Sequence, residues 1–201
     1  MKKFLIAVLA AVLAAAALPA GDLEDVKALV LKDWQLAAEG KFSECLALRA
    51  PDFTDTNDGI TADYEQTRWQ LVSLDGKHPE EFLLFLATLK FEGAKIPPET
   101  MATIREEARK PEFIKHYETA CPQFASLIKN EAAFQLKTLK IVDAEVDGDS
   151  ASVVARYERR EGKSAVPRLQ NLSLRRIDGA WKIGRIVDKS DETSPNKEKM
   201  R

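Results

Sequence analysis

The sequence is poor in the residues that build most metal and covalent sites. Its 201 residues include two histidines and two cysteines. His78 and His116 lie far apart, and no histidine or cysteine pair has the short spacing typical of zinc sites. The chain also has no glycine-rich phosphate loop, no Gly-x-Ser-x-Gly elbow and no Cys–His pairing motif. We therefore expect neither a metal nor a cofactor.

No run of basic residues stands out either. Thirty Lys and Arg residues face 32 Asp and Glu residues, for a formal net charge of -2. A nucleic acid is therefore not an expected partner. Hydrophobic residues make up 45% and charged residues 31% of the chain, which is ordinary for a globular domain with its own core.

The long apolar run lies at the N-terminus. A basic start at residues 1–3 precedes apolar residues 4–18, and small residues follow. This pattern is typical of an export signal and is short for a membrane span. We expect residues 1–20 to be a signal peptide, cut after Ala20 or alternatively after Ala17, which predicts a periplasmic or secreted protein without a stable membrane span. An uncleaved N-terminal anchor helix is the other interpretation.

The two cysteines are Cys45 and Cys121. An oxidising compartment and an even cysteine count permit a disulfide bridge between them. Pro122 follows Cys121 and predicts a helix junction where the backbone can adjust to disulfide geometry. The alternative is two buried thiols that act as small hydrophobic residues.

Helical spacing of apolar residues, interrupted by proline and glycine, predicts a mainly helical first part of the chain. Pro51 is expected to end the second helix and Thr61 to cap the third. A short edge strand at 53–56 and a turn at 57–59 are expected between them. The predicted helices span 22–40, 42–49, 61–74, 79–91, 98–110, 111–119 and 122–136. The block 77–136 has connections too short for independent linkers, so we expect it to pack against the core as a lid or flank.

Residues 137–187 show the alternation of apolar and polar residues that strands require. Turns at 147–149 and at Asp178-Gly179 predict two hairpins, and so four consecutive antiparallel strands. We expect a longer connection at Gly162–Pro167. Residues 188–201 lack an apolar pattern and predict a disordered tail. One strand face is expected to carry Ala151, Val153, Ala155 and Tyr157.

Several features together carry a family resemblance. They are a long helix with Trp34, a short helix followed by Ala50-Pro-Asp-Phe53, the pattern Val146-x-Gly148-x-x-Ala151-x-Val153, and the last hairpin Arg176–Ile183. This combination resembles the nuclear-transport-factor-2-like superfamily, the cone-shaped α+β fold shared with ketosteroid isomerase and polyketide cyclases. The resemblance implies N-terminal helices packed on a curved C-terminal antiparallel sheet. Residues 21–187 would form one domain, and the helical insertion 77–136 departs from the compact family pattern.

The resemblance also implies a cavity between the sheet and the helices. Aromatic and polar residues expected there are Trp34, Tyr64, Trp69, Arg156, Tyr157, Arg175 and Trp181. The alternative is that these are ordinary core and rim residues. Carboxylates and a hydroxyl that isomerase-like chemistry could recruit are Asp55, Asp143, Glu145 and Tyr64, and none matches a catalytic position of the family.

Three functions follow as expectations. The first is an exported non-catalytic domain that binds a small apolar ligand or a protein partner. The second is a cofactor-independent isomerase, dehydratase or cyclase that uses general acid–base residues in the cone cavity. The third is a structural role in a cell-envelope assembly. A homodimer through the sheet, as is frequent in the family, is a further expectation.

Overall fold

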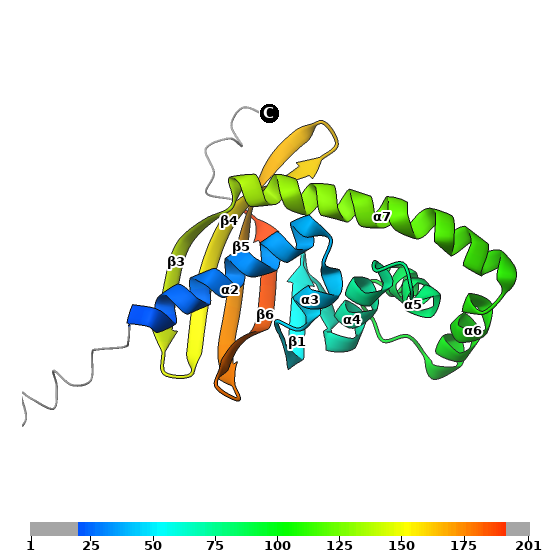
Figure 1. Cartoon of the computed structure of the whole chain (residues 1–201), viewed down its shortest axis with the longest axis horizontal. Coiled ribbons are helices and arrows are strands. Elements are labelled where there is room, and N and C mark those ends of the chain that lie inside the picture. The colour runs from blue at the N-terminus through cyan, green and yellow to red at the C-terminus, as the bar shows by residue number, and fades with distance from the viewer. Residues whose placement is uncertain (1–19, 192–201) are drawn as a thin grey trace, which may run out of the picture.

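The computed structural model describes residues 20–191, so residues 1–19 of the expected signal peptide and residues 192–201 lie outside the described part. The described chain is α+β (Figure 1). Its helices are α2 (Ala20–Glu39), α3 (Phe42–Leu46), α4 (Tyr64–Ser73), α5 (Pro79–Lys90), α6 (Pro98–Ala108) and α7 (Pro111–Thr138). Its strands are β1 (Arg49–Asn57), β2 (Ile60–Asp63), β3 (Lys140–Asp147), β4 (Ser150–Glu161), β5 (Ser164–Ile177) and β6 (Ala180–Ser190).

The strands form one curved sheet in the order β2-β1-β6-β5-β4-β3. The four C-terminal strands pair antiparallel, as the two hairpins predict. β1 joins β6 in parallel, so the sheet is mixed rather than wholly antiparallel. The expected fold class is confirmed, with helices on one face of the sheet and a helical lobe of α4, α5 and α6 beside it (Figure 1).

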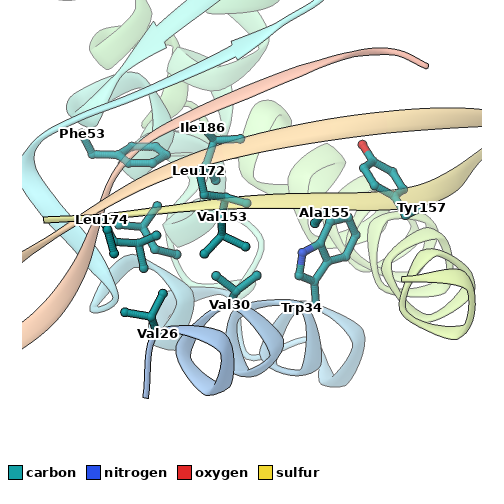
Figure 2. Close-up of a cluster of buried hydrophobic side chains, with 12 residues drawn as sticks. Val26, Val30, Trp34, Phe53, Val153, Ala155, Tyr157, Leu172, Leu174 and Ile186 are labelled. Carbon is teal, nitrogen blue, oxygen red and sulfur yellow. The ribbon is translucent and has the colours of Figure 1, made fainter. Parts of the chain in front are cut away.

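The main core lies between α2 and the sheet. Val26, Val30 and Trp34 recur at helical spacing and point from α2 toward the strands (Figure 2). The expected face of β4 is buried, with Val153 and Ala155 almost fully covered. Each large apolar side chain buried here contributes roughly 1.5–3 kcal/mol of transfer free energy.

The first strands differ from the expectation. The second helix ends at Leu46, and β1 begins at Arg49 and runs through Pro51. β1 is an interior strand between β2 and β6 rather than a short edge strand. Residues 60–63 form β2, so Asp63 rather than Thr61 caps α4, accepting from the Gln66 backbone N–H at 3.0 Å. The local pattern predicted residues 53–56 of β1 but missed β2 and the length of β1, because β1 owes its interior position to pairing with the distant β6.

The two helices expected on either side of Pro122 are one 28-residue helix, α7. A proline inside a helix removes one hydrogen bond and is usually a break. Here Tyr117 and Cys121 are buried before the proline and Ala132 after it. Packing along the whole length of α7 therefore outweighs the local cost.

Two loops are also shorter than expected. β4 continues to Glu161 and β5 begins at Ser164, so the longer connection expected at 162–167 is a tight turn of residues 162–163. Gly162 supplies the positive φ of 61° that this turn uses. β6 continues to Ser190, so residues 188–190 belong to the sheet rather than to a tail.

The expected disulfide bridge is not formed, and both cysteines are free and buried. The Cys45 thiol lies 3.7 Å from the Asp33 carbonyl oxygen, whereas the Cys121 thiol donates to the Ser73 carbonyl at 3.2 Å. Burial raises the pKa of Cys45 to about 12, which keeps it protonated and unreactive.

The helical insertion has a small core of its own, in which Phe82 lies against the ring of Tyr117 at 5.3 Å. The Tyr117 hydroxyl donates to the Ser73 carbonyl at the end of α4, at 3.1 Å. At the other end, Gln66 donates to the carbonyl oxygens of Gly93 and Ala94 after α5. The insertion is thus fastened to α4 at two points, and α5 forms a wall beside the sheet.

Candidate functional site

Two adjoining cavities lie between the sheet and the helices. The outer one, of about 410 Å³, is lined by β1, β2, α4 and α5, and its apolar wall includes Ile60, Phe85 and Leu89. The other, of about 300 Å³, is also open to solvent; we call it the inner cavity because the core residue Trp34 lines it, together with residues of α2, α4, α7 and the sheet. Asp55 and Gln70 line both cavities, so they mark the junction. Volumes of this size suit small organic ligands.

Asp55 faces the cavity because it lies two residues after Phe53, which is fully buried on the inner face of β1. It pairs with Ile186 of the core strand β6. Within residues 20–191, no group donates a hydrogen bond to the Asp55 carboxyl. Burial raises its pKa to about 6, the nearby Arg49 opposes this, and Asp188 and Asp33 add to it.

Arg49 and Asp33 form a buried ion pair beside Asp55. Arg49 Nη2 lies 2.9 Å from Asp33 Oδ2, and the Arg49 guanidinium stands 4.9 Å above the Phe53 ring. Burial alone would lower the pKa of Arg49, but the Asp33 carboxylate raises it and keeps the guanidinium charged. Asp33 Oδ1 is buried without a hydrogen-bond partner in the described chain.

A second polar cluster closes the cavity end of the sheet. Tyr157 donates to Asp188 Oδ2, and Asp188 Oδ1 accepts from Arg168 Nε at 2.7 Å. Arg168 also contacts Asp58 at 2.8 Å. Burial, and then the Asp188 charge, raise the pKa of Tyr157 well above its usual value. The Tyr157 hydroxyl is therefore committed to the network and cannot serve a ligand as an acid.

The chain is similar to several solved structures, all at low sequence identity. No family model and no curated protein matches the sequence. Solved structures do match: a nuclear-transport-factor-2-like protein with a cystatin-like fold from Novosphingobium aromaticivorans has 13% identity and a TM-score of 0.43 over 97% of this chain and 94% of its own. A cystatin-like-fold protein of unknown function from Nostoc punctiforme has 14% identity and a TM-score of 0.46 over 89% and 98%.

A ketosteroid isomerase-like protein from Erwinia carotovora atroseptica has 12% identity and a TM-score of 0.41 over 87% of this chain and 98% of its own. At such identities the likeness concerns the fold and not the activity. Helices packed on a curved sheet are what the sequence predicts, whereas the sheet is mixed rather than wholly antiparallel.

Within this fold, the structure brings few of the expected site residues into the cavity. Trp34 lines the inner cavity and meets the Tyr157 ring edge-on at 4.8 Å. Tyr64 and Trp181 instead pack against the main core, and the Trp181 ring lies under the Arg176 guanidinium. Trp69 is half-buried on α4 and is not among the residues that line either cavity.

Arg156 and Arg175 line neither of the two cavities. Arg156 is exposed and lies 2.8 Å from the buried carboxylate of Asp191. Arg175 pairs with Asp52 in a separate hollow of about 480 Å³ along the strand ends and outer sheet face. We place the candidate site in the two adjoining cavities because the unpartnered carboxyl lies there.

The cavity residues Gln70 and Arg49 escape sequence reasoning altogether. Arg49 falls where the pattern predicts the end of a helix, and Gln70 is one polar residue on a helix with little amphipathic contrast. Asp55 is among the recruitable carboxylates, but nothing in its neighbours Thr54 and Thr56 distinguishes it. The one usable signal is its spacing of two residues from Phe53 in the strand predicted at 53–56, which places both side chains on the same face of that strand.

Proposed function

We propose that the two adjoining cavities bind a small organic molecule with an apolar body and one polar group, and that the polar group lies beside Asp55. The observation that carries this is the placement of Asp55, a half-buried carboxyl without a hydrogen-bond donor in residues 20–191, at the junction of two cavities. A partly buried carboxyl that has no protein donor can interact with a bound ligand.

The walls support an amphipathic ligand rather than a purely apolar one. The mouth of the outer cavity carries the exposed apolar side chains of Ile60 and Leu89, which are 51% and 57% exposed. Further inside, carboxyl and amide groups replace them, including Gln70 and Gln170. A ligand that keeps its apolar body near the mouth and its polar group inside satisfies both regions.

Filling the outer cavity should weaken binding of a probe of this shape. We choose 2-decalone, an uncharged bicyclic ketone, and expect Ala62→Trp, whose new ring would occupy the outer cavity, to weaken its affinity at least about tenfold. The exposed Ala180→Trp, on the β5–β6 hairpin, is the matched control and should bind like the parent. Calorimetric titration measures both, and equal affinity in the two variants would refute the proposed site.

A second candidate, acid–base catalysis, is favoured by the pKa of Asp55, which burial raises to about 6, near the optimum for a general base at neutral pH. Such a base abstracts a proton next to a carbonyl group. In D₂O, catalysis would place deuterium on the α-carbons of 2-decalone, and Asp55→Asn should reduce that rate by roughly a hundredfold or more while the ketone still binds. If mass spectrometry shows the same rate of deuterium incorporation for Asp55→Asn, Asp55 is not a catalytic base and the binding function alone stands.

A further inference from the structure

The cavity lining offers no free positive charge. Neither Lys nor Arg is among the residues that line the outer cavity. The inner cavity is lined by one cation, Arg49, and this guanidinium is already paired with Asp33. Its Nε and Nη1 atoms are buried and have no hydrogen-bond acceptor in the described chain. Within residues 20–191, neither cavity is therefore lined by a cation whose charge is not already balanced by a carboxylate.

The lining of the inner cavity, by contrast, carries more negative than positive charge. Asp55 and Glu131 both line the inner cavity, and in the described part of the chain neither has an ion-pair partner at hydrogen-bonding range. Glu131 Oε1 accepts only uncharged donors, the Gln135 amide at 2.9 Å and the Arg160 backbone N–H at 3.0 Å. With the Asp33–Arg49 pair neutral overall, the inner cavity carries two uncompensated carboxylates once Asp55 is ionised.

Two further features of the lining are independent of this charge. Asp33 is 9% exposed, and its Oδ1 atom has no hydrogen-bond donor within residues 20–191. Trp34 contributes an aromatic ring to the same wall. A buried acceptor without a donor is satisfied by an N–H group, and an aromatic face attracts a cation.

From this lining we propose that the ligand is an organic cation, an amine on a compact apolar body, whose ammonium group lies in the inner cavity beside Asp55 and Glu131. The inference rests on the proposed function, because it names the class of molecule that the same cavity takes. An ammonium group offers three donors and no acceptor, which matches a wall rich in acceptors. Its apolar body would extend past Gln70 to Ile60 and Leu89 at the mouth.

The negative charge of the cavity distinguishes ligands that have the same shape but different charges. An ammonium group gains charge-assisted hydrogen bonds to the carboxylates. A carboxylate of the same shape would be repelled by Asp55 and Glu131 in a partly desolvated site, where repulsion between like charges is strong. An uncharged ketone would experience neither the attraction nor the repulsion, so it serves as the reference.

The test compares three decalins that differ in one group: 2-aminodecalin, 2-decalone and decalin-2-carboxylate. We expect the amine to bind the full chain about tenfold more tightly than the ketone, and the carboxylate more weakly than both. Asp55→Asn should remove most of the amine's advantage and leave ketone affinity unchanged. Asp178→Asn, which removes one exposed carboxylate at the β5–β6 turn, should change neither affinity.

The outcomes separate the two proposals. Ketone binding without any advantage for the amine, or tighter binding of the carboxylate, would overturn the cation assignment and leave the binding cavity standing. Failure of all three compounds to bind the parent chain would overturn the proposed function as well. Circular dichroism of Asp55→Asn tests whether its fold is intact. Glu131→Gln should also lower the affinity for the amine selectively, and so gives a second measurement of the same charge effect.

Discussion

Replacing Arg168 with methionine should destabilise the fold by about 3–5 kcal/mol, because the change leaves a buried carboxylate without its counter-ion. The Arg168 side chain is 1% exposed, and its Nη2 lies 2.6 Å from Asp188 Oδ1. It also donates to Asn57 at 3.2 Å and so links β5 to β6 and β1. Methionine has similar length but no donor, so Asp188 would keep only the Tyr157 hydroxyl.

Urea denaturation measures the loss, and Arg175→Met provides the matched control. Arg175 also pairs with an aspartate, Asp52, but 43% and 64% of the two side chains are exposed. Exposed ion pairs contribute about 0–1 kcal/mol, so this variant should be nearly neutral. A double variant Arg168→Met with Asp188→Asn should recover part of the loss. If Arg168→Met cost no more than Arg175→Met, the buried network would not stabilise the sheet as we infer.

Asp55→Asn should stabilise the fold at pH 7 by up to about 3 kcal/mol, because one pKa unit corresponds to about 1.4 kcal/mol. The pKa of Asp55 rises from an ordinary 3.8 to about 6 on folding, chiefly through burial. Between these values the folded chain binds the proton more tightly, so stability falls as pH rises. Below about pH 4 the carboxyl is protonated in both states, and the asparagine should give no gain.

Thermal or urea unfolding of the parent and of Asp55→Asn from pH 4 to pH 8 tests this. The gain should appear across the interval between the two pKa values and stay constant above it. The exposed Asp178→Asn should show no such pH-dependent difference. A pH-independent effect of Asp55→Asn would mean that hydration of the cavity holds the pKa near its ordinary value. The predicted gain means that the native aspartate costs stability, as functional residues often do.

The sequence alone predicts much of the scaffold, because its strongest signals are local. Alternation of apolar residues identifies the buried face of β4, and the Asp-Gly pairs position the two hairpins. Pro79 begins α5 as its position predicts. These features depend on neighbours a few residues apart, and side-chain period and turn geometry are properties of such short stretches.

Only the tertiary structure decided the rest, because it depends on contacts between residues distant in sequence. β1 carries Pro51 and two aspartates, poor strand residues, and forms because its backbone pairs in parallel with β6. α7 passes through Pro122 because it packs along its whole length. The site has the same origin: Asp55 becomes an unpartnered acid only when β1, α4 and α7 enclose it with Gln70 and Glu131. Its altered pKa comes from burial, which no local pattern contains.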